Sequence, residues 1–320
     1  MPIREGWDVT SGGLVDFHAH FLTDRYLAEA RAAGITNPDG MPGWPTWSAD
    51  AHLALMAESG IAKAFLSISS PGVHFGDTRA ARLLAGHVND EASRIQQSDP
   101  ERFGFFAALP LPDVGAAVVE AVRAIDELGA AGVSMLTHHN GLYLGDPALE
   151  PLWDALNSRA TVVHVHPTSP PGWERLPDRP RPMLEFLFET ARSFIDLLLA
   201  EVPKRHSRVR FVAAHCGGAL PLVIERAERF SQAFLTGGEP LGLREQLARI
   251  WFDTAGTPLP DQLPSLVSVV GEGRILYGSD YCFTPPPAVA GQLASLNASP
   301  PASDSSWAAL TTRNAARCLA

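Results

Sequence analysis

Clusters of basic residues, long apolar runs and a signal-peptide core are all missing from this 320-residue sequence. Its formal net charge is −10, and it has no Lys/Arg cluster with interleaved aromatic residues, which argues against a nucleic-acid partner. No stretch reaches the roughly 18 uninterrupted apolar residues of a transmembrane helix, and residues 1–13 lack an apolar core. We therefore expect a cytosolic protein that binds a small molecule and contacts neither nucleic acid nor membrane.

Cysteine and lysine are scarce. The three cysteines, Cys216, Cys282 and Cys318, are odd in number and show no CxxC spacing, which argues against a disulfide framework and against a cysteine-type zinc site. The only lysines are Lys63 and Lys204, and neither lies at the end of the fourth expected strand, where a carbamylated lysine could bridge two metal ions. The sequence therefore disfavours a binuclear metal site.

The chain instead contains a regular alternation of strand-like and helix-like segments. Strands are expected over residues 14–18, 64–68, 102–109, 132–136, 161–165, 209–214, 250–252 and 274–277. Helices are expected over residues 49–59, 78–97, 113–128, 148–158, 183–201, 219–234, 261–269, 287–296 and 303–318. A doubly wound sheet would carry a Gly-rich phosphate loop after its first strand, but HAHFLTD stands there. We therefore predict one α/β domain over residues 1–320, a (β/α)8 TIM barrel with an extra C-terminal helix.

Four of the apolar strands end in side chains that bind metals or transfer protons. These are His18 and His20 on the first, His164 and His166 on the fifth, His215 after the sixth, and Asp280 after the eighth. In a parallel barrel, catalytic groups gather where the strands end. His18 and His20 are two residues apart, so their side chains point to the same side. Burying two adjacent imidazoles is unfavourable unless a metal or hydrogen-bond partners satisfy them.

Two of these positions have rival interpretations. His166 ends the fifth strand because Pro167 follows it, and we prefer it to His164, which has the same side-chain parity but lies deeper in the strand. Asp280 follows Gly-Ser, and its alternative role is an N-cap, although the prolines at 285–287 make an immediate helix poor. Three histidines and one aspartate then form a predicted mononuclear metal site.

The remaining histidines differ in their surroundings. His215 precedes Cys216-Gly217-Gly218, small residues that allow substrate or metal-bound water close to the backbone. His215 is thus a residue beside the metal, a fourth protein ligand, or merely the start of a helix. We expect solvated side chains at His52, His87 and His206, and pocket-lining side chains at His74, His138 and His139.

The motifs VDFHAHF, HVHP, AAHCGGALP and LYGSDY, together with their spacing, resemble the amidohydrolase superfamily. The resemblance is to the branch that contains aminocarboxymuconate semialdehyde decarboxylase, γ-resorcylate decarboxylase and 6-methylsalicylate decarboxylase. The stretch PGWPTWSADAHLALMAESGIAKAFLSISSPGV is most similar to the 6-methylsalicylate decarboxylase group. The resemblance implies that His18, His20, His166 and Asp280 hold one metal ion per chain. Zn is the slight favourite and Mn the alternative, since nitrogen-rich ligation suits Zn.

The same resemblance implies a reaction. We expect the non-oxidative decarboxylation of a small aromatic, salicylate-type acid or of a muconate-semialdehyde-like acid, with release of CO2. His215 or Asp280 would supply the proton to carbon, and His215 would contact the metal-bound water. The alternative is a metal-dependent hydrolase of a lactone or amide. A barrel retained only for binding or scaffolding would be expected to lack some ligands, and all four are present.

Substrate contacts are expected from four residues. Trp44 and Trp47, in the loop 37–47, and Phe75 would form apolar walls against a ring, although ordinary loop packing explains them equally well. Arg79 would bind the substrate carboxylate, with Arg226 as a rival. An arginine from a second subunit is a third source, in a homodimer or higher homo-oligomer.

Overall fold

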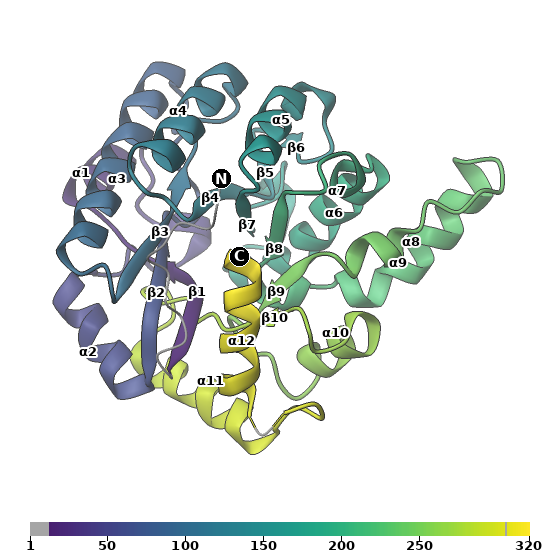
Figure 1. Cartoon of the computed structure of the whole chain (residues 1–320). Coiled ribbons are helices and arrows are strands. Elements are labelled where there is room, and N and C mark those ends of the chain that lie inside the picture. The colour runs from purple at the N-terminus through teal and green to yellow at the C-terminus, as the bar shows by residue number, and fades with distance from the viewer. Residues whose placement is uncertain (1–12, 305) are drawn as a thin grey trace.

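The computed structural model describes residues 13–304 and 306–320, and Figure 1 shows the whole chain. The start of the expected 1–320 domain and residue 305, in the expected 303–318 helix, therefore lie outside the described residues. Within the described part of the chain, no helix is long and apolar enough to cross a membrane.

Eight parallel strands build a nearly closed barrel at the centre of the molecule (Figure 1). In sheet order they are β1 (Leu14–His20), β2 (Ile61–Ser67), β3 (Phe103–Ala108), β4 (Gly132–Leu136), β7 (Val162–His166), β8 (Arg210–Ala213), β9 (Trp251–Asp253) and β10 (Ile275–Leu276). The first and last strands meet through a bridge between Asp16 and Tyr277 and through the Phe17 amide, which donates to the Tyr277 carbonyl at 2.9 Å. This arrangement confirms the predicted (β/α)8 barrel.

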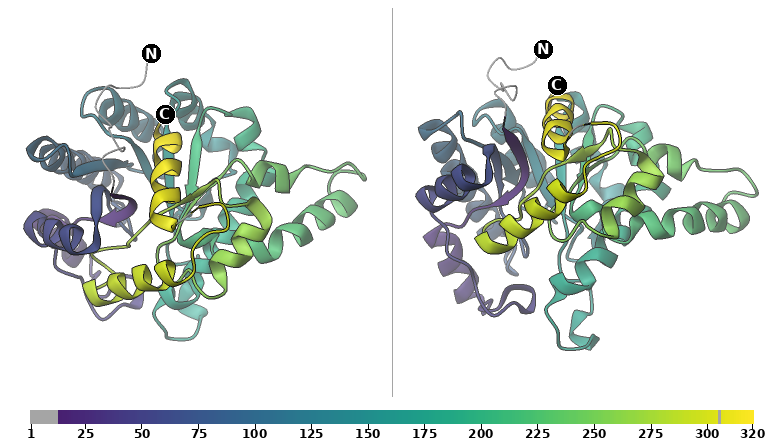
Figure 2. Two further views of the ribbon diagram at one scale, coloured as in Figure 1. Left: turned by 60° about the horizontal axis from the view of Figure 1, so that its bottom comes forward. Right: turned by 90° about the horizontal axis from the view of Figure 1, so that it is seen from below.

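Helices surround the strands. They are α1 (Asp24–Ala32), α2 (Ala49–Ser59), α3 (Thr78–Ser98), α4 (Val114–Asp126), α5 (Glu150–Ser158), α6 (Glu185–Leu199), α7 (Val202–Arg205), α8 (Leu220–Phe234), α9 (Leu243–Leu247), α10 (Gln262–Val270), α11 (Pro286–Ala298) and α12 (Trp307–Leu319). The predicted caps of α2 are confirmed: the Ser48 side chain accepts from the Ala51 amide, and Gly60 ends the helix at φ 68°. Figure 2 shows α8 and the segment after it projecting from the barrel.

Two local features differ from the sequence-based expectation. Helix α1 and a short hairpin of β5 (His138–His139) with β6 (Leu142–Tyr143) were not expected. As expected, no helix follows Asp280 immediately, and α11 begins at Pro286. Proline suits a first helical turn because its missing N–H has no intrahelical partner there.

A β-bulge in β1 decides what the barrel interior contains. Relative to β2, β1 carries an extra residue between Asp16 and Ala19. As a result, Phe17 and His18 both face interior side chains although they are sequence neighbours. The Phe17 ring lies 5.1 Å from the Phe65 ring, and the His18 ring lies 4.8 Å from the His164 ring. The bulge therefore sets an aromatic layer directly beneath a histidine layer.

Helix α12 covers the end of the barrel below that aromatic layer, and Figure 1 shows it in yellow beside β1 and β10. Its Ala315 and Cys318 belong to the same buried cluster as Phe17. The Asn314 side-chain amide donates to the Ile275 carbonyl at 2.9 Å, and the Thr312 hydroxyl donates to the Gly13 carbonyl at 3.0 Å. The histidine layer accordingly lies toward the opposite end of the barrel.

Candidate metal and active site

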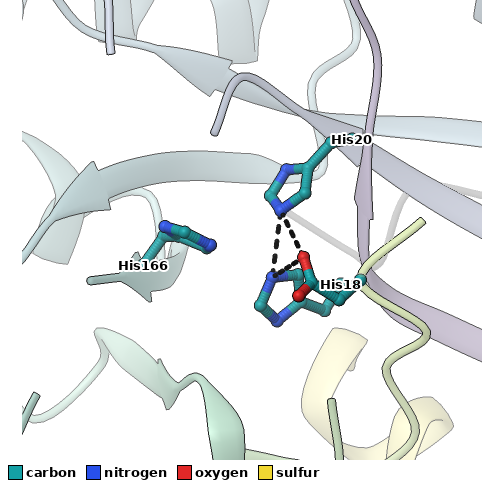
Figure 3. Close-up of side chains that lie close together, drawn as sticks. His18, His20 and His166 are labelled. Carbon is teal, nitrogen blue, oxygen red and sulfur yellow. Dashed lines mark hydrogen bonds and ion pairs between the residues drawn. The ribbon is translucent and has the colours of Figure 1, made fainter. Parts of the chain in front are cut away.

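His18 and His20 of β1 point toward one another (Figure 3), and Asp280, after β10, meets them at the same point. The Nε2 atoms of His18 and His20 lie 3.1 Å apart. Oδ1 of Asp280 lies 3.4 Å from the first and 3.1 Å from the second. Both imidazoles are completely buried, so these contacts are shielded from water.

His166 completes the group from β7. Its ring centroid lies 5.0 Å from that of His18 and 4.9 Å from that of His20. Potential ligand atoms of the four residues lie within 4.8 Å of one another. The structure thus brings together all four side chains that the sequence singled out as ligands. His164 is not part of this group of four. Its Nε2 donates to Asp253 at 3.0 Å, and it forms a separate group with His18 and Asp253.

The three histidines share one orientation, because each donates its Nδ1–H to an oxygen of the surrounding protein. The acceptors are Asp253 Oδ2 at 3.0 Å for His18, Ser67 Oγ at 3.1 Å for His20, and the Pro167 carbonyl at 2.6 Å for His166. The Ser67 hydroxyl proton is directed to the Ala19 carbonyl, so Ser67 accepts from His20. Such partners fix the tautomer of a metal-ligating histidine.

This orientation makes the centre of the group favourable for a positive charge. With Nδ1 protonated, a neutral imidazole presents a bare Nε2 lone pair, so two such lone pairs and a carboxylate oxygen would face one another unless a proton or a metal ion lay between them. Burial lowers the pKa of His20 and of His166, which keeps both neutral. Burial also opposes charge on His18, but Asp253 and Asp280 outweigh it and raise its pKa to about 10. The site thus favours a positive charge at this point, and its donor set fits a transition-metal ion.

Asp280 is placed by tight connections between β1 and the segment after β10. Its amide donates to the His18 carbonyl at 2.7 Å, and its backbone adopts the left-handed region at φ 60°. Oδ1 of Asp16 accepts from the amides of both His18 and Ser279 at 3.0 Å. Burial would raise the pKa of Asp280, but the adjacent side chains of His18, His20 and His215 hold it well below its usual range. Asp280 is not the N-cap of α11, a position that Pro285 occupies.

His215 lies beside the group, with its Nε2 3.6 Å from Asp280 Oδ2. It follows β8 and begins a backbone reversal in which residues 215–218 all have positive φ. Glycine is required at 218, because a Cβ there would lie 2.2 Å from the Leu187 carbonyl oxygen. The glycines after His215 therefore serve the packing of this turn rather than the close approach of a ligand.

Asp253, the last residue of β9, is a residue that the sequence analysis missed. Its Oδ2 accepts from His18 Nδ1 and from His164 Nε2, both at 3.0 Å. Its Oδ1 accepts from the amides of His215 and Ala255, also at 3.0 Å. The signal was present, since Trp251-Phe252-Asp253 is also an apolar run that ends in an acid. The strand has only three residues, and this shortness hid the pattern.

A small cavity of about 160 Å³ opens onto this group, and we call it the metal chamber. Its lining comprises Pro38, Asp39, Met41, Ser69, Ser70, His166, Pro182, Phe186, His215, Asp280, Phe283 and Thr284. The chamber thus combines apolar side chains on its walls with the metal-binding group and His215.

The predicted substrate residues lie outside this lining. The Trp44 indole donates to the Ile35 carbonyl at 2.8 Å, and its ring lies 6.4 Å from the ring of Phe283. The ring of Trp47 packs 5.9 Å from that of Phe21, and the ring of Phe75 packs 5.7 Å from that of Tyr26. Arg79 is exposed in the first turn of α3, and Arg226 is exposed on α8. Their contact with a substrate stays a prediction.

The expectation of solvated side chains was wrong for His52 and His206, which are both buried. His52 accepts a hydrogen bond from the Trp47 indole at 3.1 Å, and His206 Nε2 lies 2.8 Å from Glu150. Their surroundings come from distant segments, which a helical position alone does not reveal. His87 is half-buried. His74, His138 and His139 do line a cavity, but it is a second cavity beside the metal chamber.

The comparisons with known proteins agree with this geometry. The sequence model of the Amidohydrolase family matches residues 15–320. A decarboxylase of Aspergillus niger is 33% identical over 290 residues, covering 85% of this chain and 77% of its own. A 6-methylsalicylic acid decarboxylase of Aspergillus aculeatus is 33% identical, with 86% of each chain covered. A crystal structure described as an amidohydrolase II superposes with a TM-score of 0.87 at 31% identity, covering 96% of this chain and 99% of its own. The chain therefore belongs to the amidohydrolase family, as its four motifs predicted.

Proposed function

We propose that this protein is a metal-dependent decarboxylase of a small aromatic carboxylic acid of the salicylate type, or of a muconate-semialdehyde-like acid. The observation that carries the proposal is the convergence of three histidines and one carboxylate at the metal chamber. Relatives that are decarboxylases by name support the reaction type, and 6-methylsalicylic acid is the substrate named for two of them.

His18, His20, His166 and Asp280 would hold one ion, because their ligand atoms surround a single point. Neither lysine lies in this group: Lys63 donates to the Pro100 carbonyl, and Lys204 donates to the Leu241 carbonyl. When bound, the metal supplies a Lewis acid beside the carboxylate or ortho-hydroxyl oxygen of the substrate. Zn is our first choice from the nitrogen-rich donor set. Mn is the alternative, and a 5-carboxyvanillate decarboxylase from Novosphingobium aromaticivorans has been solved in complex with manganese.

The protein's own groups would carry the proton to carbon. His215 lines the metal chamber and lies within 3.6 Å of Asp280, so this pair can hold a proton near the substrate ring. Transfer of that proton to the ring carbon that bears the carboxylate allows the bond to the carboxyl carbon to break. CO2 then leaves, the bonding electrons return to the ring, and its aromaticity is restored. Protonation of carbon by a positioned side chain is general acid catalysis.

The size and lining of the metal chamber support a substrate of one ring. Its 160 Å³ is below the roughly 300–1,000 Å³ of pockets for larger ligands. Phe283 and Phe186 offer apolar surface, and Trp44 packs behind Phe283. We propose Trp44, Trp47 and Phe75 as the supports of this apolar wall. Arg79, which does not line the chamber, would bind the substrate carboxylate at its entrance.

We also propose a homodimer or higher homo-oligomer. Large apolar side chains are exposed on α8 and just after it, at Leu222, Phe230, Phe234 and Leu235. Others are exposed near the start of α6, at Met183, Leu184 and Phe188. Contiguous exposed apolar surface favours contact with another protein surface. Sedimentation of the purified chain measures the mass directly, and a monomer at micromolar concentration would contradict this part.

The reaction is tested with the purified chain, loaded with Zn or Mn and incubated with salicylate, 6-methylsalicylate and 2,6-dihydroxybenzoate. We expect release of CO2 and, in deuterated water, one deuterium at the ring carbon that carried the carboxylate. Lactones and aryl amides are run beside these acids in ¹⁸O-labelled water. Labelled oxygen in a new acid group, with no CO2 from any aromatic acid, would replace decarboxylation with hydrolysis.

A further inference from the structure

A second group of possible metal ligands lies among the helices outside the strands, and we call it the wall site. It consists of Glu150 and Asp154 in α5 and of His206, the residue after α7. One potential ligand atom of each residue lies within 4.8 Å of the others. Figure 1 shows α5 and α7 as neighbours on the outside of the barrel. None of these three residues lines the metal chamber, so the wall site is a separate group.

Two segments of the chain contribute to the wall site. Glu150 begins α5 and Asp154 follows four residues later, a spacing that places both carboxylates on one face of the helix. His206 reaches this face from the segment between α7 and β8. In the same segment, the Arg208 amide donates to the side chain of Asn157 in α5 at 3.0 Å. The wall site therefore joins α5 to the part of the chain that leads into β8.

His206 distinguishes this group from an ordinary acidic surface. Its side chain is only 4% exposed, although Glu150 and Asp154 both reach the solvent. Its Nε2 lies 2.8 Å from Glu150 Oε1, and its Nδ1 lies 3.8 Å from Asp154 Oδ1, beyond hydrogen-bond distance. This Nδ1 is shielded from solvent and has no hydrogen-bond partner in the part of the chain that the structure describes. A buried polar atom of this kind is unfavourable unless a ligand satisfies it.

The tautomer of His206 indicates what that ligand is. When Nε2–H donates to Glu150 in the neutral ring, Nδ1 presents a lone pair toward the Asp154 carboxylate. A proton on Nδ1 would lie too far from Asp154 for a hydrogen bond, whereas a metal ion can bridge the two atoms. Zinc bonds of about 2.0–2.2 Å set a nitrogen and an oxygen ligand roughly 3.4 Å apart in a tetrahedral shell. A small movement of the exposed Asp154 side chain would therefore complete the contact.

The charges around the wall site favour a cation. Arg205 pairs with Glu150 and offsets one of the two carboxylate charges. Arg205 and, to a smaller extent, His206 hold the pKa of Glu150 below its usual value, so this carboxylate is ionised at neutral pH. Among the residues described, Asp154 has no ion-pairing neighbour within 4.0 Å except His206. One imidazole and two carboxylates suit zinc better than magnesium, which prefers a shell of oxygen atoms.

We propose that Glu150, Asp154 and His206 bind a zinc ion that ties α5 to the segment entering β8. This ion is separate from the one in the metal chamber and touches no group assigned to the reaction. Because only three protein ligands are present and two of them are exposed, the ion exchanges with solvent and is removed by desalting. An ion that binds only the folded chain stabilises it by mass action, so the role of the wall site is structural. The proposal does not rest on the proposed function, since its test measures binding and stability and not turnover.

Zinc chloride is titrated by calorimetry into the full chain, after the metal chamber has been loaded with zinc and weakly bound ions have been removed by desalting. We expect one further equivalent to bind, and no such step with magnesium chloride. Asp154→Asn should weaken the step at least about tenfold, because even residues that only orient a metal ligand contribute about 10–100-fold to metal affinity. The matched control is Glu201→Gln, which removes an exposed carboxylate just before α7 and should leave the step unchanged.

Thermal unfolding gives a second readout of the same site. Zinc beyond the first equivalent should raise the Tm of the wild-type chain and of Glu201→Gln, but not that of Asp154→Asn. His206→Gln should lose both the binding step and the rise in Tm. If this buried substitution prevents folding, Asp154→Asn decides, because its side chain is 74% exposed and can be changed without disturbing the core. A zinc step that is unchanged in Asp154→Asn, or no further step up to millimolar zinc, would overturn the proposal.

Discussion

The two ends of the barrel share their strands but differ in what fills them. At the end covered by α12, the interior is apolar: Phe17, Phe65 and Phe106 pack with ring centroids 5.1–5.9 Å apart. At the other end, the interior is occupied by buried histidines and acids that hold one another by hydrogen bonds. The transition takes place within one contact, where the rings of Phe106 and His164 stack at 5.7 Å.

The difference separates two free energies: the covered end contributes to the stability of the fold, and the open end contributes to metal binding. Apolar burial at the covered end stabilises the fold without any ligand. Buried polar groups at the open end are stable only while every member has its partner, and the Nε2 atoms of His18 and His20 face each other and Asp280, an arrangement that needs a cation to satisfy it. Stability and metal binding should therefore separate when each end is altered on its own.

Replacing His18 and His20 together by alanine should have the largest effect. We expect loss of the bound metal and of all measurable turnover, because half of the ligand set is removed. The barrel should remain folded, since the aromatic layer below is untouched. Elemental analysis and circular dichroism check the two halves of this expectation, and metal retained at one equivalent with normal turnover would show that the site lies elsewhere.

His215→Asn should reduce kcat by about 10²–10⁴-fold, the usual contribution of a proton-transfer group. Asparagine keeps a similar size and some hydrogen bonding but has no acid–base capacity. Metal content should stay near that of the wild-type chain, because the His215 amide, which donates to Asp253, is preserved. Loss of metal in this variant, with turnover restored by added Zn or Mn, would instead place His215 among the ligands.

Phe65→Ala tests the covered end. Removing this buried ring should lower the free energy of unfolding by about 3–5 kcal/mol, the usual cost of a Phe→Ala cavity in a core. Urea unfolding measures the loss. Metal affinity and kcat of the folded fraction should change little, and a parallel collapse of metal binding at low urea would mean that the two ends are not separable.

Asp253→Asn should weaken metal binding by about 10–100-fold, as expected for a group that orients a ligand through a hydrogen bond. The amide keeps the size of the carboxylate but loses the negative charge that faces His18 and His164. Competition with a metal-binding dye gives the affinity without relying on turnover. Asp261→Asn is a control on a carboxylate at the start of α10, outside the histidine group. Equal affinities for all three chains would assign Asp253 a purely structural role.

Lowering the pH should have the smallest effect. The lowered pKa of His52 predicts that the free energy of unfolding falls in acid. Burial, with a smaller effect from His20, lowers the pKa of His52 to about 3. His52 therefore binds a proton near pH 6.5 in the unfolded chain but not in the folded chain. Its contribution to the free energy of unfolding is complete above pH 6.5 and is lost as the pH falls toward 3. Between pH 7 and pH 5.5 the loss is about 1 kcal/mol. His52→Gln, which still accepts from Trp47, should show a shallower fall in urea unfolding midpoints, and an identical fall would contradict this account.

The sequence predicted the parts of the molecule that follow from local periodicity. Strand ends carrying His18, His20, His166 and Asp280 were evident because apolar runs stop at side chains of metal-binding type. The barrel followed from the number and order of these runs. The capping residue Ser48 was likewise predictable, since an N-cap acts within four residues.

What escaped prediction depends on contacts between distant segments. The bulge of β1 is defined only by its register with β2, and the role of Asp253 only by three partners from other strands and loops. Burial of His52 and His206 arises from neighbours that are remote in sequence, Phe103 for the first and Glu150 for the second.

The meeting of β1 with the segment after β10 has a consequence for how the chain is made. His18 and Asp280 are separated by 262 positions, yet they contribute to one group of ligand atoms. His18 and His20 leave the ribosome long before Asp280 and wait for its synthesis before a complete coordination set can exist. Contacts of such long sequence separation form late and slow the folding of a domain. Full occupancy by metal would thus mark a chain synthesised beyond Asp280, and shorter nascent chains would be left without it.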